Sequence, residues 1–179
     1  LLGCMLYPFM IVYFAEHFGE AVAGFMMAFN VGAGILAQLY GGHFSDMHGR
    51  RKVLIITSII AFVLHLLMTI FNSNYFIFPT CTFVLFFFIS IVNGFSFPAA
   101  SAMIIDCTTL DERKFVYGLQ YWLFNAAFLV GNLVGGFMFL HYKTLLMSLI
   151  TFGDIISIFI MVFCIQELYK PDGKPRKMI

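Results

Sequence analysis

The chain has 179 residues, of which 61% are hydrophobic and 11% are charged, and its formal net charge at pH 7 is +1. Soluble domains contain about 25% charged residues, so this composition, with a mean hydropathy of +0.95, predicts a protein embedded in a lipid bilayer. A nearly neutral chain with a single tryptophan offers neither a basic surface nor a stacking platform, and we therefore predict no nucleic-acid partner.

The apolar segments predict an all-α membrane protein with six transmembrane helices. A helix that crosses the hydrocarbon core needs about 20 mostly apolar residues, and six segments meet or approach that length. They cover residues 1–18, 21–44, 53–71, 75–105, 115–140 and 144–166. Because the connections are short, consecutive helices are predicted to be antiparallel and to form one bundle. The polar segment after them, residues 167–179, contains proline and glycine and is predicted to begin a linker.

The chain begins at Leu1 on an apolar run, without a basic region ahead of it. This pattern differs from that of a signal peptide, in which a charged segment precedes a short apolar core. We therefore expect the sequence to start inside a helix, as a fragment of a longer protein would.

Basic residues mark one side of the predicted bundle. They follow spans two, four and six, whereas Lys143 is the one basic residue in a connection on the opposite side. Short cytoplasmic loops retain Lys and Arg, so the N-terminus and residues 167–179 are predicted to be cytoplasmic parts of a multi-pass protein of the cell membrane. The basic residues on that side are Arg50, Arg51, Lys52, Arg113, Lys114, Lys170, Lys174, Arg176 and Lys177.

The first basic cluster belongs to a polar segment, GGHFSDMHGRRK, at residues 41–52. We expect its glycines to form the turn between two antiparallel helices, because glycine tolerates positive φ angles. The segment resembles the signature of the loop between the second and third helices of the major facilitator superfamily, except at Met47, where that family usually has a base. The matching residues are Gly42, Phe44, Ser45, Asp46, Gly49, Arg50 and Arg51.

The resemblance implies a conformational gate at this loop. In such a gate Asp46 docks against the start of a helix in a second six-helix half of the same chain and holds one state of an alternating-access cycle. A carboxylate at the membrane surface is favourable near cations or the positive end of a helix. Arg50 and Arg113 are its predicted partners, and these arginines have two further acids within reach, Asp106 and Asp111. The alternative is that the loop only anchors the topology.

Span five carries a second resemblance, to the fifth helix of drug–proton antiporters of this superfamily. Asn132 stands where those proteins usually have proline, and Ala127 stands where a glycine is expected. Ala127, Gly131 and Gly135 are spaced four apart. Small residues at this spacing allow helices to approach closely in lipid. The resemblances together cover essentially the whole chain and imply the N-terminal half of a 12-helix fold. The residues of span five that carry the likeness are Arg113, Tyr121, Asn125, Gly131, Gly135 and Gly136.

Two ionisable side chains, His65 in span three and Asp154 in span six, lie well inside predicted spans. A charge at that depth is costly, so each is a functional hypothesis. Both lie at the same depth, counted from the cytoplasmic ends of their spans, and we predict a hydrogen bond or ion pair between them. This pair either carries a coupling proton or only fastens two helices. Glu16, at the predicted outer mouth, is a third candidate for proton coupling.

The resemblance implies a secondary active transporter, and we expect it to export small apolar or drug-like compounds in exchange for protons. Its expected partners are the small-molecule substrate, protons, the lipid bilayer and the second six-helix half. Alternatives within transport are a proton-coupled uptake symporter and a complete six-helix protein that dimerises. The candidates for the substrate pathway are polar and aromatic residues within the spans: Tyr13, Asn30, Gln38, Asn93, Gln120, Tyr121 and Asn125.

An intramembrane enzyme is the alternative outside transport. The sequence contains no HExxH segment and no pair of aspartates within its apolar spans. Its four cysteines lie far apart, without the spacing of a metal site or a disulfide framework. We therefore predict a protein that is not an enzyme and that binds neither a metal nor a cofactor.

Overall fold

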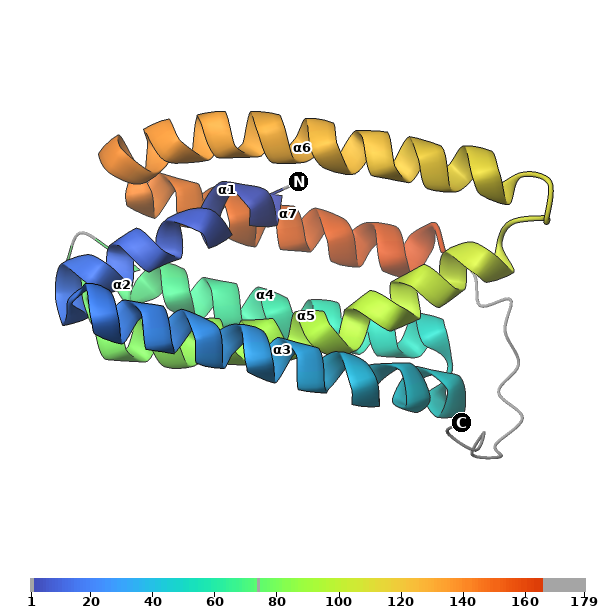
Figure 1. The fold of residues 1–179 in the computed structure, drawn as a ribbon, viewed down its shortest axis with the longest axis horizontal. Helices are drawn as coiled ribbons and strands as arrows, with labels where there is room; N and C mark the ends of the chain where they lie inside the picture. The colour runs from blue at the N-terminus through green and yellow to red at the C-terminus, as the bar shows by residue number, and fades with distance from the viewer. Residues whose placement is uncertain (1, 74, 166–179) are drawn as a thin grey trace.

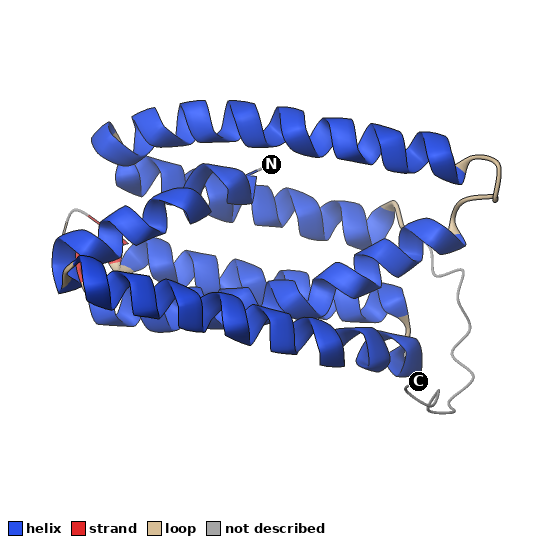
Figure 2. Cartoon of the chain, in the orientation of Figure 1, coloured by secondary structure: helices blue, strands red, loops and turns tan. Residues whose placement is uncertain are grey.

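The computed structural model describes residues 2–73 and 75–165, which are almost entirely helical (Figure 2). Two short antiparallel strands, β1 (Asn72–Ser73) and β2 (Phe76–Ile77), pair between the fourth and fifth α-helices. The helices are α1 (Leu2–Leu6), the 3-10 turn η1 (Tyr7–Phe9), α2 (Met10–Phe18), α3 (Glu20–His48), α4 (Arg50–Ile70), α5 (Pro79–Asp106), α6 (Arg113–His141) and α7 (Lys143–Phe163). The predicted linker, residues 167–179, lies outside the described residues.

Five helices, α3 to α7, are long and apolar enough to cross a membrane. They carry many exposed large apolar side chains, among them Phe25, Leu133 and Phe159. An apolar surface of this extent on a helical bundle fits contact with lipid rather than water. The predicted all-α transmembrane bundle is confirmed.

The first predicted span, residues 1–18, is helical throughout its described residues, but a 3-10 turn interrupts the α-helix. The segment is divided into α1, η1 and α2, with Pro8 inside the 3-10 turn η1. Proline has no backbone N–H, and its ring clashes with the carbonyl of the preceding turn, so an α-helix cannot run through it undisturbed. Residues Tyr7–Phe9 therefore form a 3-10 turn between α1 and α2.

The polar segment 41–52 is mostly helix, whereas a loop was predicted. Helix α3 continues to His48, and of the glycines in this segment only Gly49 has a positive φ, 92°. Gly41 lies in the helix against α5, where an added Cβ would be 2.6 Å from the Cα of Phe95. Glycine serves close helix packing at this position and a turn only at Gly49. The predicted start of span four, at Tyr75, was also wrong, because Phe76–Ile77 forms strand β2 and α5 begins at Pro79.

The connections gather at the two ends of the bundle (Figure 1). The α3–α4 turn, the α5–α6 loop and the end of α7 lie at one end, which we call the basic end because Arg50 and Arg113 begin helices there. The α2–α3 turn, the β1–β2 hairpin and the α6–α7 turn lie at the other, which we call the hairpin end. This alternation is the one predicted from the short connections.

Helices α3, α4, α5 and α7 form the packed body of the bundle, with α5 against α3 and α4, and α4 against α7. The main core cluster lies toward the hairpin end and includes the fully buried Tyr13, Phe14 and Phe86. Helix α6 lies to one side, along α1 and α7 (Figure 1). Its contact with α1 is close at Gly135, where an added Cβ would be 2.7 Å from the Cα of Met5.

Candidate functional site

An ion-pair network at the basic end joins three helices through one arginine. Arg50, the first residue of α4, donates from Nη1 to the Asp106 carboxylate and, over 2.8 Å, to the backbone carbonyl of Ala102, both on α5. Its Nη2 lies 3.4 Å from Asp46 Oδ1 on α3. The Arg50 side chain is only 10% exposed, so these contacts are poorly screened by solvent. The predicted pairing of Arg50 with Asp46 and Asp106 is confirmed.

Two other arginines of the basic end, Arg51 and Arg113, donate hydrogen bonds to backbone carbonyls. Arg51 donates from Nη2 to the carbonyl of Val162 over 2.6 Å, which joins the start of α4 to the last turn of α7. Arg113 donates to the carbonyl of Ile105 over 3.4 Å. The predicted pairing of Arg113 with an aspartate was wrong, because the guanidinium reaches the carbonyl of Ile105 in the last turn of α5 instead.

The short α5–α6 loop is closed by a side-chain cap. The Glu112 carboxylate accepts hydrogen bonds from the Thr109 amide, over 3.1 Å, and from the Thr109 hydroxyl, over 2.7 Å. These two donors favour the charged carboxylate and hold the pKa of Glu112 below its usual range. These bonds hold the loop together just before α6 begins at Arg113.

The predicted pair within the membrane forms: His65 Nδ1 on α4 lies 2.7 Å from Asp154 Oδ2 on α7. This hydrogen bond confirms the contact that the matched depth of the two residues predicted. Toward the hairpin end, the hydroxyls of Thr69 and Thr151 are 3.1 Å apart and make a second polar link between the same helices. Helices α4 and α7 are therefore joined by two polar contacts within their apolar spans.

A cavity of about 430 Å³ lies between α4, α5 and α7, and the Asp154 side chain is part of its wall. Asn93, also in the wall, donates from its amide to the Tyr7 hydroxyl over 2.5 Å. A carboxylate and several neutral polar groups thus share one cavity within the spans. The other polar residues that line it are Thr57, Ser58, Ser96 and Ser157.

A buried polar cluster at the hairpin end joins four segments, and sequence reasoning missed it. Its centre is Asn72 in β1, whose Oδ1 accepts a hydrogen bond from the Tyr13 hydroxyl over 2.6 Å. The Asn72 amide donates to Thr82 Oγ1 over 2.7 Å, and the Asn72 carbonyl accepts from Thr144 Oγ1 over 3.1 Å. Tyr13, Asn72 and Thr82 are all at most 5% exposed. The cluster holds α2, β1, α5 and α7 together.

Replacing Asn72 by leucine is expected to lower the free energy of unfolding by about 2–4 kcal/mol. The change removes the acceptor of the buried Tyr13 hydroxyl and the donor to Thr82 Oγ1, which keeps only its bond to the carbonyl of Phe78. Leaving a buried polar group unsatisfied costs about 1–3 kcal/mol. Thermal unfolding in detergent would measure the effect. Asn132→Leu is the matched control, because the Asn132 amide donates only to the carbonyl of Phe128 in its own helix. Equal unfolding temperatures for the two variants would contradict a stabilising role of the cluster.

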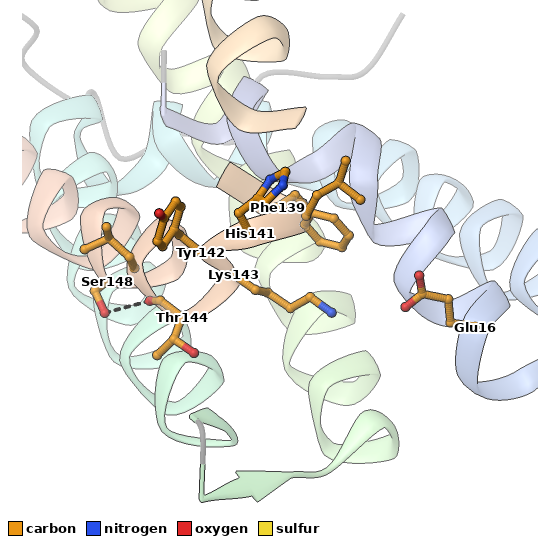
Figure 3. Close-up of a pocket in the computed structure, with 9 residues that line it drawn as sticks. Glu16, Phe139, His141, Tyr142, Lys143, Thr144 and Ser148 are labelled. Carbon is orange, nitrogen blue, oxygen red and sulfur yellow. Dashed lines mark hydrogen bonds between the residues drawn. The ribbon is translucent and has the colours of Figure 1, made fainter. Parts of the chain in front are cut away.

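A larger open pocket, about 690 Å³, lies at the hairpin end between α2 and the α6–α7 turn (Figure 3). Lys143 extends across it in the direction of Glu16. The Lys143 ammonium is 4.7 Å from the centroid of the Tyr13 ring and 4.9 Å from that of Phe139, distances at which cation–π attraction acts. Glu16 therefore faces a cation at the mouth of the bundle, and its role in proton coupling stays a prediction.

The candidates for the substrate pathway do not gather at one place. Tyr13 belongs to the hairpin-end cluster and Asn93 to the cavity with Asp154, while the Asn30 side chain is buried. The others are exposed on α3 and α6, namely Gln38, Gln120, Tyr121 and Asn125. Their function in substrate binding stays a prediction. Among the described residues, no group of three or more His, Cys, Asp or Glu side chains is placed to hold a metal ion.

Long apolar helices, a polar pair within the spans and an ion-pair network at one end define a multi-pass membrane protein. A family model described as the Major Facilitator Superfamily matches residues 2–178. The chain belongs to this family, whose members are membrane transporters. The resemblance of the segment 41–52 and of span five to that superfamily is thereby confirmed.

Relatives of the chain include transporters with different printed names. The chain is 29% identical, over 91% of its length, to a Na(+), Li(+), K(+)/H(+) antiporter of Planococcus maritimus, and covers 38% of that protein. It is 28% identical, over 68% of its length, to multidrug resistance protein 2 of Bacillus subtilis, and covers 29% of it. It also matches the uncharacterised MFS-type transporter YhjO of Bacillus subtilis, with 25% identity over 98% of the chain and 42% of that protein. The chain thus spans less than half the length of these relatives.

Proposed function

We propose that the chain is the N-terminal half of a secondary active transporter that exports small apolar or drug-like compounds in exchange for protons. The observation that carries this proposal is the Arg50 network at the basic end, in a chain that belongs to a transporter family. A second six-helix half of the same protein completes the transport pathway. The basic end faces the cytoplasm of the cell membrane, as the distribution of Lys and Arg favours.

The network supports alternating access because it ties the basic ends of three helices to one side chain. Asp46 on α3 and Asp106 on α5 share the Arg50 guanidinium. The Asp46 side chain is 35% exposed, so one face of its carboxylate is accessible to a helix end of the second half. A state in which the halves meet at the basic end is stabilised by this contact, and the pathway opens there when the contact breaks.

Exchange of a monovalent cation for protons is the second candidate function. It is supported by the printed name of the Planococcus maritimus relative, a Na(+), Li(+), K(+)/H(+) antiporter. Asp154 also lines a cavity with the hydroxyls of Thr57, Ser96 and Ser157, and hard cations prefer oxygen ligands. Apolar export has its own support in the printed name of multidrug resistance protein 2.

Everted membrane vesicles that contain the full-length protein test these functions. An acidic interior quenches a pH-gradient dye, and a compound exchanged for protons restores the fluorescence. Recovery with lipophilic compounds, absent from vesicles without the protein, is the expected result. Recovery with sodium, lithium or potassium salts alone would favour the second candidate. No recovery with any of them would contradict proton exchange and favour an uptake symporter.

A further inference from the structure

We propose that His65 and Asp154 together form the proton-binding site of the transporter. This inference rests on the proposed function, since it names the residues that bind the exchanged proton. The two side chains face each other across α4 and α7, with 2.7 Å between Nδ1 and Oδ2. Neither the Arg50 network nor the hairpin-end cluster includes them.

The pair lies within the spans and is largely shielded from solvent. The His65 side chain is 9% exposed and that of Asp154 is 22% exposed, within two helices that cross the membrane. An unpaired charge at such a depth is strongly disfavoured. The pair carries a net charge of −1 with a neutral imidazole and a carboxylate, and a net charge of zero after it binds one proton. Proton binding thus removes the net charge of the site, whichever of the two side chains holds the proton.

The cavity beside Asp154 gives the proton a route. Its wall includes Asp154 from α7, Thr57 and Ser58 from α4, and Asn93 and Ser96 from α5. These neutral polar side chains can hydrogen-bond water, which conducts protons without carrying a competing charge. Apolar residues fill the rest of the wall, so Asp154 is the one charged group that lines the cavity within the described residues.

Few other titratable groups face the pair. From η1, the Tyr7 hydroxyl accepts the hydrogen bond of Asn93 in the cavity wall. Helix α5 contributes neutral residues to the cavity, and the span of α4 contributes His65 as its ionisable group. Among the described residues, the cavity wall around the pair offers neutral dipoles to compensate a change in its net charge, so the α4–α7 contact is sensitive to the proton.

Helix α4 connects the pair to the basic end. It begins with Arg50, which binds α5 and α3, and with Arg51, which binds the last turn of α7 at Val162. Binding or release of a proton between His65 and Asp154 changes how strongly α4 and α7 attract each other. The same two helices are joined at the Arg51–Val162 contact, so the proton state biases the arrangement of the basic end.

The test uses Asp154→Asn in the full-length protein, with Thr151→Val as the matched control. Thr151→Val removes the second polar contact between α4 and α7 within their apolar spans but no titratable group. Asp154→Asn is expected to lose substrate-dependent proton release in everted vesicles while it keeps exchange of labelled for unlabelled substrate, which needs no proton. The control is expected to keep both. Proton release at the wild-type level in Asp154→Asn would overturn the proposal.

A measurement without substrate separates this inference from the proposed function. Infrared difference spectra of the purified protein between about pH 8 and about pH 5 report protonation of carboxyl and imidazole groups. We expect bands that are present in the wild type and in Thr151→Val and that disappear in Asp154→Asn and change in His65→Gln. Unchanged spectra in Asp154→Asn would overturn the proton site even if the protein exchanges protons. Loss of these bands in Asp154→Asn would support the proton site even if none of the tested compounds is a substrate.

Discussion

Replacement of Arg50 by glutamine is expected to abolish transport while leaving the protein in the membrane. The change removes the guanidinium that joins α3, α4 and α5, and it leaves the Asp106 carboxylate and the Ala102 carbonyl without this donor. Breaking the pair is expected to cost about 1–3 kcal/mol of stability, less than for a fully buried pair, because the Asp106 side chain is 25% exposed. The larger effect falls on function, since one conformation loses its contact at the basic end.

Lys52→Gln is the matched control for this prediction. It removes the same charge two residues away, from an exposed side chain. Initial rates of substrate-dependent proton release, normalised to the amount of protein in the membrane, compare the two variants. Equal rates in Arg50→Gln and Lys52→Gln would contradict a specific role of the Arg50 network in transport.

Replacement of Gly41 by alanine is expected to destabilise the bundle by about 1–3 kcal/mol, the usual cost of overpacking a tight contact. The added methyl group would lie 2.6 Å from the Cα of Phe95. Because that neighbour is backbone rather than a flexible side chain, α3 and α5 must move apart. Gly94 on α5 approaches α3 in the same way. A Cβ added at Gly94 would lie 2.7 Å from the Cβ of Ala37. Gly94→Ala is therefore expected to act similarly.

Gly24→Ala, on the same helix as Gly41, separates packing from helix propensity. No atom lies within 4 Å of a Cβ added at Gly24. Alanine is the better helix former by about 1 kcal/mol, so this control is expected to be neutral or stabilising. Thermal unfolding followed by size-exclusion chromatography in detergent would give both values. A Gly41→Ala variant as stable as Gly24→Ala would contradict the close α3–α5 contact.

The features that the sequence predicted correctly are those imposed by the membrane itself. Long apolar runs must become helices in lipid, because backbone groups there have no water to bind. A histidine and an aspartate within such runs need partners, and matched depth was sufficient to join His65 to Asp154. Arg50 pairs with Asp46 for a similar reason, because the two residues are four positions apart in the sequence, on either side of Gly49.

The features that were missed depend on how distant segments pack. The contact of Arg51 with the carbonyl of Val162 has no signature, because any residue provides a carbonyl. Asn72 looked like an ordinary loop residue, yet the β1–β2 hairpin turns it inward to Tyr13 and Thr82. Gly41 was assigned to a turn, because periodicity does not distinguish a glycine that bends the chain from one that lets a neighbour approach.

Proton exchange by the full-length protein, purified and reconstituted in liposomes with a pH-sensitive dye inside, tests the central claim most directly. A gradient of a lipophilic compound is imposed across the membrane, and the internal pH is followed as the compound moves. We predict proton movement opposite to that of the compound in the wild type and in Lys52→Gln, and none in Arg50→Gln. Movement of the compound with no change in internal pH in the wild type would contradict a proton-coupled exchanger.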